Sequence, residues 1–389
     1  MKKETMRRVN VLAVLNQIYN HPQISRAEIS RQLGLNKATV SDVLKELIAK
    51  HLVVEVGEGE SSDSGGRKPL QLQLNADYAF TISVDFGYHF IAYMINDLAG
   101  HTLDYERVAT PTESPTQRQE MVRQFIQAHL DRPSVAGLAG IVISVHGIVH
   151  NNQVLYSPHV KMADIDLHGV LTAAFHVPVV LENEANLSAI YERDFAERTT
   201  ARNNLITLSI HHGIGAGIII NNALYRGRNS EAGEIGHTTA YLTPEGQEAS
   251  FEEICTQAAL FRDVKAACQL PTLTTAELHA LLAAHDPNAE RIVQRFRKYL
   301  LVLIRNLILS FSPSVVVLTS DIITEIPELL SGFPEQVTTI TGQTTNVEFS
   351  TNPYTGTLLG GTAVLVSRIF GLHRTHSTET TVESTDHHH

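Results

Sequence analysis

The sequence predicts a winged helix-turn-helix head of mixed α and β structure, followed by a larger α/β body. Residues 8–50 hold three consecutive segments whose apolar residues recur at helical spacing, with a glycine between the second and the third. The runs 52–56 and 70–74 are rich in aliphatic residues and are expected to pair as the two strands of a wing. From residue 81 onward, strand-like and helical segments alternate, which is typical of α/β layers.

Local signals set the ends of the three helices in the head. The first helix is expected over 9–20, where it ends before a His-Pro pair. Ser25, followed three residues later by Glu28, forms a capping box that opens the second helix. Asn36 is expected to cap the third helix, over 37–50, which turns an apolar face toward the other two.

The start of the third helix and the end of the wing loop are the expected DNA-contacting parts. In helix-turn-helix proteins the N-terminal residues of the last helix face the major groove, where small polar side chains reach base edges and phosphates. The wing loop ends in two adjacent cations, which suit a phosphate or minor-groove contact. The structural alternatives are a three-helix bundle without a DNA role and a solvated linker. The residues predicted to contact DNA are Asn36, Lys37, Thr39, Ser41, Arg67 and Lys68.

Charge is distributed unevenly along the chain. The 389 residues carry a net charge of −11, which by itself argues against nucleic acid. Residues 1–75, however, hold 11 Lys and Arg against 8 Asp and Glu, whereas the remainder holds 19 against 33. A weakly basic head on an acidic body fits a DNA-binding unit joined to a sensor.

Composition indicates the cellular compartment and argues against a cysteine-rich metal site. No apolar run approaches the roughly 18 residues needed to span a bilayer, and the N-terminus lacks the apolar core of a signal peptide. Two cysteines offer neither a disulfide framework nor a cysteine-rich zinc site. We therefore expect a cytoplasmic protein with no membrane partner.

The predicted strands and helices of the body form two successive segments of similar order, the second of which starts at residue 205. Polar residues follow several of its strands, and ligands bind at the carboxyl ends of strands in such sheets. Residues 299–309 are so apolar that we expect them to be buried between lobes or subunits. The expected elements are strands at 81–88, 90–95, 140–145, 177–181, 205–210 and 315–318, and helices at 115–131, within 251–311 and at 356–368.

A stretch at 230–237 is a candidate ligand site. It follows a glycine-rich segment at 213–217, and it carries Glu234 and His237 three residues apart. Glycine allows the backbone to approach a ligand closely, and a carboxylate with an imidazole can accept hydrogen bonds from the hydroxyls of a small polyol. The structural alternative is a strand–turn–helix junction with a surface Glu and a capping His.

Together these motifs resemble the ROK family, which contains sugar kinases and sugar-responsive repressors. The resemblance covers about residues 8 to 370. It implies that the body has the duplicated actin-like (ribonuclease H-like) fold, in which two α/β lobes close on a cleft. The expected division is a head with its wing and linker at 1–75, the two-lobed sugar-binding body at 76–370 and a disordered tail at 371–389. The matching motifs are 65–69 beside the wing, 85–87, 144–147, 182–186, 213–217 and 233–237.

The resemblance also implies which residues hold the hydroxyls of a sugar. These are Asn183, Glu184, Glu234, His237 and a later glutamate, for which Glu252 is preferred and Glu253 is the alternative. A site built for hydroxyls rejects ligands that lack them, because its polar groups would be left unpaired.

Several departures from the family pattern argue against a kinase. Glu184 stands where a family kinase has an Asp as general base, and an extra methylene shifts the carboxylate. Bulky residues at 88–90, histidines at 211–212 and an acid at 321 replace small residues that would approach phosphates. Residues 238–250 lack the cysteines with which some relatives bind zinc. We therefore expect no catalytic residue, no metal and no cofactor.

The leading hypothesis is a sugar-responsive transcriptional repressor that is not an enzyme. With these departures, the sequence most resembles the branch of the family that contains xylose-repressor-like and N-acetylglucosamine-repressor-like proteins. Xylose or another monosaccharide is therefore the expected effector. Operator DNA and a second copy, in a homodimer or higher homo-oligomer, are the expected partners. The alternatives are an ATP-dependent sugar kinase that retains a DNA-binding head, a repressor with a vestigial pocket, and a regulator that binds a transport protein, as some relatives do.

Overall fold

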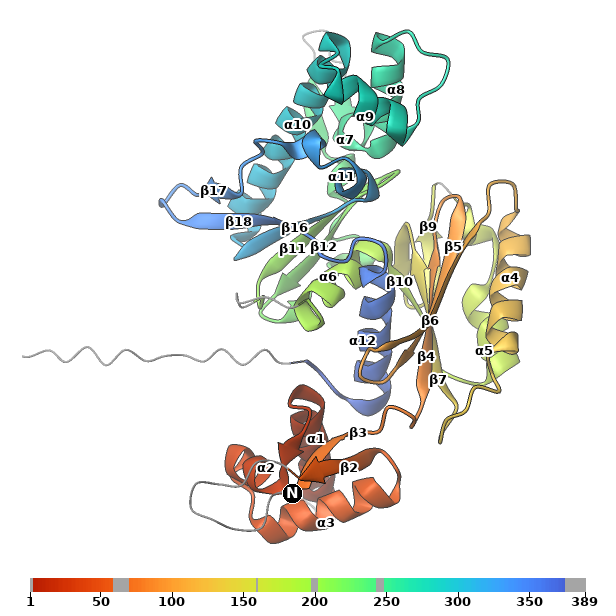
Figure 1. The fold of residues 1–389 in the computed structure, drawn as a ribbon, viewed down its shortest axis with the longest axis vertical. Coiled ribbons are helices and arrows are strands. Elements are labelled where there is room, and N and C mark those ends of the chain that lie inside the picture. The colour runs from red at the N-terminus through yellow and green to blue at the C-terminus, as the bar shows by residue number, and fades with distance from the viewer. Residues whose placement is uncertain (1–2, 59–69, 159, 197–201, 243–247, 375–389) are drawn as a thin grey trace, which may run out of the picture.

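The structure, a computed structural model, describes residues 3–58, 70–158, 160–196, 202–242 and 248–374. A small head lies at one end of a body made of two sheet-containing lobes (Figure 1). The lobe that follows the head in sequence lies beside the second one, and helices from both parts of the chain run between their sheets (Figure 1). Among the described residues, no helix is long and apolar enough to cross a membrane.

The head is a winged helix-turn-helix, as predicted. The side chain of Ser25 accepts a hydrogen bond from the backbone of Glu28, whose carboxylate in turn accepts one from the Ser25 backbone at 2.8 Å. Gly34 ends the second helix in the left-handed conformation, with φ +63°, and Asn36 caps the third. The elements are α1 (Lys3–Asn20), β1 (Ile24–Ser25), α2 (Arg26–Leu33), α3 (Lys37–Ala49), β2 (Val53–Glu58) and β3 (Leu70–Leu74), with the strands in the order β1-β3-β2.

The first lobe has a five-stranded sheet in the order β10-β7-β4-β5-β6. β4 pairs in parallel with β7 and antiparallel with β5. The sequence prediction missed β6, an edge strand that is almost entirely exposed. The strands are β4 (Phe80–Phe86), β5 (Phe90–Asp97), β6 (Thr102–Ala109), β7 (Leu138–Val145) and β10 (Val179–Asn183), with α4 (Pro115–Ala128), α5 (Leu167–Phe175) and the small hairpin β8 (Ile148–His150) and β9 (Gln153–Tyr156).

The second lobe repeats this arrangement. β11 pairs antiparallel with β12 and parallel with β16, as β4 does with β5 and β7. The predicted duplication of an actin-like lobe is therefore present. The six strands, in the order β13-β12-β11-β16-β18-β17, are β11 (Leu205–Ile210), β12 (Ile214–Ile220), β13 (Ala223–Leu224), β16 (Val315–Thr319), β17 (Gln336–Thr338) and β18 (Thr344–Phe349). The further elements are the pair β14 (Thr239–Leu242) and β15 (Glu248–Ser250) and the helices α7 (Glu252–Cys255), α8 (Gln257–Ala267), α9 (Thr275–Ala283), α10 (Pro287–Phe311) and α11 (Asp321–Glu325).

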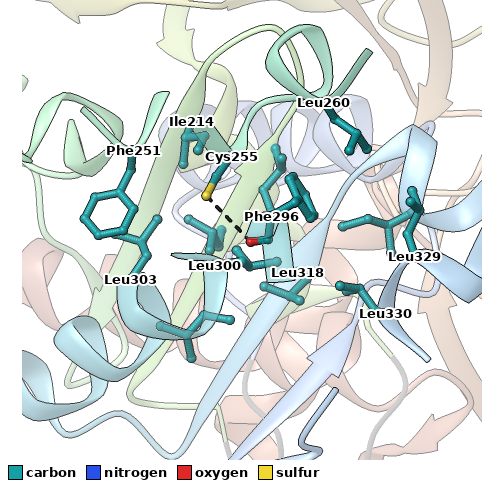
Figure 2. Close-up of a cluster of buried hydrophobic side chains, with 14 of the residues drawn as sticks. Ile214, Phe251, Cys255, Leu260, Phe296, Leu300, Leu303, Leu318, Leu329 and Leu330 are labelled. Carbon is teal, nitrogen blue, oxygen red and sulfur yellow. Dashed lines mark hydrogen bonds between the residues drawn. The ribbon is translucent and has the colours of Figure 1, made fainter. Parts of the chain in front are cut away.

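The long helix α10 packs mainly inside its own lobe. Its inner face meets Phe251 and Cys255 in the lobe's core, where the Cys255 Sγ lies 3.8 Å from a carbonyl oxygen of α10 (Figure 2). Burial raises the pKa of Cys255 to about 12, so this thiol stays neutral. Val302 and Leu309, on the same helix, are 40% and 53% exposed. The prediction that 299–309 is buried between lobes was therefore wrong for the monomer, since one face lies in the core and the other faces outward.

Two helices, α6 (Glu184–Asp194) and α12 (Gly356–Phe370), cross between the sheets of the two lobes (Figure 1). They approach so closely that a Cβ at Gly360 would lie 2.0 Å from the Leu187 carbonyl oxygen. Only glycine fits there. Beyond α12, residues 371–374 lie against α1 of the head, and Leu372 is buried in the head's core. The predicted disordered tail thus begins with four placed residues, and 375–389 lies outside the described residues.

Candidate functional site

A cavity of about 300 Å³ lies between the two lobes. It is lined by the ends of β4 and β10, the start of β12, the segment before β14, and the first residues of α6, α7 and α12. The carboxyl ends of the central strands meet here, as the α/β pattern predicts. The lining includes all five residues predicted to hold a sugar, namely Asn183, Glu184, Glu234, His237 and Glu252.

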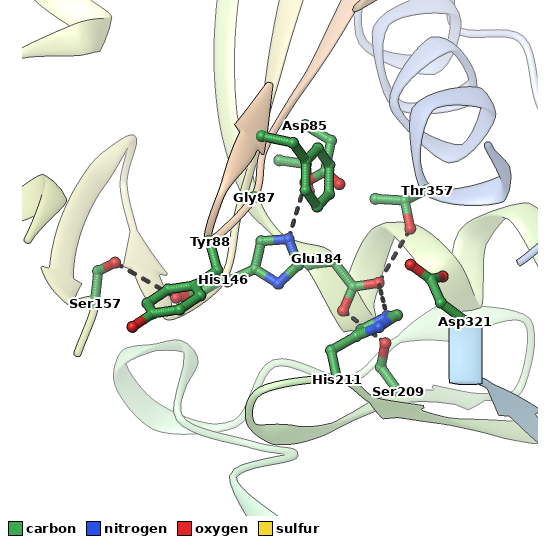
Figure 3. Close-up of polar contacts among 12 residues, drawn as sticks. Asp85, Gly87, Tyr88, His146, Ser157, Glu184, Ser209, His211, Asp321 and Thr357 are labelled. Atoms are coloured by element: carbon green, nitrogen blue, oxygen red, sulfur yellow. Dashed lines mark hydrogen bonds and ion pairs between the residues drawn. The ribbon is translucent and has the colours of Figure 1, made fainter. Parts of the chain in front are cut away.

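Glu184 is held by contacts from both lobes. It is the first residue of α6, and its side chain is only 8% exposed. One carboxylate oxygen accepts a hydrogen bond from the Ser209 hydroxyl at 2.7 Å, and the other accepts one from the Thr357 hydroxyl at 3.1 Å (Figure 3). The His211 Nε2 lies 3.8 Å from the second oxygen. The carboxylate is therefore a fixed acceptor that β11 and α12 share.

Asn183 joins β10 to α6. Its Oδ1 accepts from the Asn186 backbone as the cap of α6, at 3.0 Å, and its Nδ2 donates to the Gly147 carbonyl at 2.9 Å. A primary amide has a second N–H and a second lone pair. One hydrogen and one lone pair of Asn183 are thus available to a ligand, while the rest of the amide fixes the junction.

The Glu234 and His237 side chains come from two tight turns beside the cavity. Gly233 has φ +99°, and a Cβ there would lie 2.0 Å from the Ala216 carbonyl oxygen, so glycine is required. His237 Nε2 lies 3.8 Å from Glu234 Oε2. Burial raises the pKa of Glu234; His237 opposes this shift and Glu252 adds to it. The proposed acceptor is therefore easier to protonate than a surface glutamate.

The two adjacent glutamates of α7 face different surroundings. The Glu252 carboxylate lines the cavity under two glycines, and Cβ atoms built on Gly213 and Gly236 would lie 3.3 and 3.1 Å from it. Glu253 is exposed, and its carboxylate accepts from the Ser250 backbone at 2.8 Å. Of the two alternatives left by the sequence, Glu252 lies on the cavity.

On the opposite side of the cavity, a buried ion pair forms at the ends of β4 and β7. His146 Nε2 lies 3.0 Å from Asp85 Oδ1, and the Ser144 hydroxyl donates to the same oxygen at 2.9 Å (Figure 3). Burial disfavours both charges, but the pairing outweighs it, so the pKa of Asp85 is lowered and that of His146 is raised to about 9. Sequence reasoning placed His146 in a family motif and did not predict its role, although a histidine at a strand's carboxyl end was an available signal.

Aromatic and charged side chains fill the part of the cavity where family kinases would approach phosphates. The Tyr88 ring lies 4.0 Å from the His89 ring and 4.2 Å from the His212 ring, centroid to centroid. Arg107 Nη2 lies 3.8 Å from Asp321 Oδ2. Rings occupy space that glycine would leave open, and the Asp321 carboxylate repels phosphate. Among the described residues, no group of three His, Cys, Asp or Glu side chains could hold a metal ion.

The predicted DNA-contacting residues of the head lie at the start of α3. Asn36 and Lys37 are exposed, and Thr39 is partly exposed. The Ser41 hydroxyl donates to the Lys37 carbonyl at 2.7 Å and accepts from Arg26 Nη1 at 3.1 Å, so contacts within the head use it. Arg26, which the sequence analysis missed, is thereby held beside the first turns of α3. Arg67 and Lys68 lie outside the described residues.

Comparison with known proteins bears on both parts of the chain. The ROK family model matches residues 81–354, and a MarR family model matches 8–67. The chain is 38% identical to the xylose repressor of Lactiplantibacillus pentosus over 96% of each chain, and 38% identical to that of Staphylococcus xylosus over 93% of this chain and 96% of that protein. Among solved structures, a ROK family transcriptional regulator, a homolog of the E. coli MLC protein, superposes with a TM-score of 0.76 at 22% identity, over 94% of this chain and 97% of that one. A ROK family glucokinase from Streptomyces griseus shares the body fold, with a TM-score of 0.61 at 21% identity, over 73% of this chain and 98% of that one. The chain therefore belongs to the ROK family.

Proposed function

We propose that this protein is a sugar-responsive transcriptional repressor that binds operator DNA through its head and a monosaccharide in the cavity between its lobes. D-xylose is the first candidate effector, because the most similar relatives described above are named xylose repressors. The cavity supports a polyol ligand, since the carboxylates of Glu184, Glu234 and Glu252 are among the polar groups that line it. Asn36, Lys37, Thr39 and Arg26 are the proposed contacts to DNA.

One observation carries this proposal: helix α12 connects the cavity to the head. Near its N-terminus, the Thr357 hydroxyl donates to Glu184. In its middle, Thr362 donates to Asn96 at 3.1 Å within the first lobe. Past its C-terminus, Leu372 is buried among residues of the head. A ligand that changes the position of Glu184 therefore acts on a helix whose other end is fixed to the DNA-binding unit.

The C-terminal end of this connection is a clamp formed by residues 371–374 on α1. Asn16 accepts from the His373 backbone at 3.1 Å and donates to the Gly371 carbonyl at 3.3 Å. The Arg374 guanidinium lies 4.4 Å from the centre of the Tyr19 ring and donates to the Ala99 carbonyl at 2.9 Å. Arg374 thus contacts both the head and the β5–β6 turn of the first lobe.

The repressor works through a population shift. As a homodimer it would place two α3 helices in successive major grooves of a palindromic operator. The sugar weakens DNA binding only if it binds the low-affinity arrangement of the heads more tightly than the other. Closure of the two lobes on the sugar would supply that difference by moving α12.

The second candidate function is a sugar kinase that retains the head, which the shared body fold and a carboxylate at Glu184 favour. We propose that the protein is not an enzyme. The rings of Tyr88 and His212 and the Asp321 carboxylate support this, because the rings occupy space on the phosphate side and the carboxylate repels the phosphates of ATP.

The wild-type protein separates these functions in one set of measurements. We expect D-xylose at about 100 times its dissociation constant to raise the free energy of unfolding by about 2.7 kcal/mol. The sugar should also weaken binding to a DNA site selected by the protein from a random library, with no sugar-dependent ATP hydrolysis. Lys37→Ala should weaken DNA binding and reduce the salt slope by about 1. Steady sugar-dependent turnover would favour the kinase, and no shift with any monosaccharide would favour a vestigial pocket.

Replacing Arg374 by Ala should uncouple the sugar from the DNA. The change removes the contacts of Arg374 with Tyr19 and Ala99 and alters no residue of the cavity. Allosteric couplings usually amount to 5- to 150-fold, and we expect the factor by which D-xylose weakens DNA binding to fall several-fold toward 1. The measurement is DNA affinity with and without the sugar, alongside calorimetry of sugar binding.

The matched control for this variant is Arg368→Ala, which removes an exposed arginine from the last turn of α12. It should leave the coupling factor unaltered. An undiminished factor in the Arg374 variant would show that the clamp does not transmit the signal.

A further inference from the structure

The five residues proposed to hold the sugar supply more hydrogen-bond acceptors than donors. Ionised Glu184, Glu234 and Glu252 can only accept. Half of the Asn183 amide is used within the protein. Each sugar hydroxyl can accept as well as donate, and the ring oxygen can only accept. A donor fixed beside these acceptors would therefore let the site bind more of the sugar's oxygens.

His146 is placed to supply it. Its ring lines the cavity and is 22% exposed, and Figure 3 shows it between Asp85 and Glu184. Nε2 is fixed by Asp85 Oδ1, and Ser144 holds that oxygen from the other side. Within the described part of the chain, Nδ1 makes no hydrogen bond. One edge of the ring is therefore anchored, and the other is available to a ligand.

We infer that His146 is a ligand-contacting residue that donates a hydrogen bond from Nδ1 to a sugar oxygen, with Asp85 and Ser144 as its positioning residues. This inference rests on the proposed function. It adds a charged donor beside the three glutamates proposed to accept hydrogen bonds from the sugar, and it assigns a role to the ion pair of His146 and Asp85.

The protonation state of the ring decides whether Nδ1 can donate. A neutral imidazole that donates from Nε2 to Asp85 has a bare Nδ1, whereas the imidazolium donates from both nitrogens. Burial opposes the charge, but Asp85 raises the pKa of His146 to about 9, with Glu184 and Asp321 adding to the shift. Among the described residues, the His211 ring also faces His146, 6.1 Å away between centroids. The donor is thus present at neutral pH and is lost as the pH rises through about 9.

The test uses His146→Gln, because the amide of Gln can reach Asp85 from the position of Nε2 while nothing replaces Nδ1. We expect D-xylose to bind this variant about 10- to 100-fold more weakly, the usual range for a lost hydrogen bond to a charged group. Wild-type affinity should fall as the pH rises through about 9, and the variant's affinity should stay flat there. The deoxy analogue of D-xylose that lacks the hydroxyl contacted by His146 should bind the wild type weakly. Its affinity should not fall further in the His146→Gln variant.

Asp85→Asn tests the positioning role. Without the carboxylate the pKa of His146 falls, so the loss of sugar affinity should move to lower pH, which a purely structural role would not produce. Thermal unfolding shows that each variant is folded. The inference is overturned if the His146 variant binds D-xylose as tightly as the wild type. It is also overturned if the variant loses the same affinity for every deoxy analogue while the wild type's affinity does not depend on pH. If no pentose or hexose binds the wild type, the proposed function falls together with it.

Discussion

Replacing Glu252 by Gln is expected to weaken binding of the sugar effector by about 1.5–3 kcal/mol, or roughly 10- to 150-fold. The Glu252 carboxylate lies on the cavity beneath two glycines, where a sugar hydroxyl can donate to it. Gln keeps the shape but removes the charge, and a hydrogen bond to a charged group is worth about twice one between neutral groups. The pKa of Glu234 should also fall, because Glu252 helps to raise it.

The adjacent residue provides the matched control. Glu253→Gln makes the same chemical change one position along α7, where the carboxylate is exposed and accepts from the Ser250 backbone. Calorimetric titration with D-xylose should give the wild-type dissociation constant for this variant. Equal losses from both substitutions would mean that Glu252 acts through the fold of α7 rather than through contact with the sugar.

Replacing Arg202 by Met is expected to lower the free energy of unfolding by about 3–5 kcal/mol. The Arg202 side chain is 1% exposed, and it pairs with fully buried Glu192 of α6 and, at 2.9 Å, with Glu348 of β18. Without the guanidinium, the Glu192 carboxylate still accepts a hydrogen bond from the Ser350 hydroxyl at 2.6 Å, but this partner carries no charge. A buried charge that loses its partner costs far more than the pair contributed.

Urea denaturation measures this loss, and two further variants locate its cause. Arg262→Ala removes an arginine that is 60% exposed and pairs with Asp263, so it should cost at most about 1 kcal/mol. The double substitution Arg202→Met with Glu192→Leu should recover much of the stability, because the deepest charge is then gone. A single Arg202→Met variant within about 1 kcal/mol of the wild type would show that water reaches Glu192.

The ion pair of Arg202 and Glu192 also bears on the proposed sugar site. α6 begins with Glu184 in the cavity and carries Glu192 two turns later, so the ion pair anchors the helix that presents the proposed sugar ligand. α12 crosses α6 at Gly360 and continues to the head. Stable placement of α6 is therefore a condition for any signal that passes from the cavity to α3.

The sequence by itself determined the features that depend on near neighbours along the chain. The caps at Ser25 and Asn36 follow from side chains three residues from their partners, and the strands and helices follow from their apolar period. The five proposed sugar residues lie around one cavity because each follows a strand or a turn that ends beside the space between the two lobes. The edge strand β6 buries almost none of its residues, and it was missed.

Only the tertiary structure decided which distant groups meet. The ion pair of Asp85 and His146 joins residues 61 positions apart, and Arg374 contacts Tyr19 across 355 positions. Local sequence carries no record of such pairings, because hydrogen bonds and charge interactions depend on distance in space, which the packing of whole strands and helices sets. The same packing turned Glu252 toward the cavity and Glu253 toward solvent, a choice that two identical adjacent residues could not reveal.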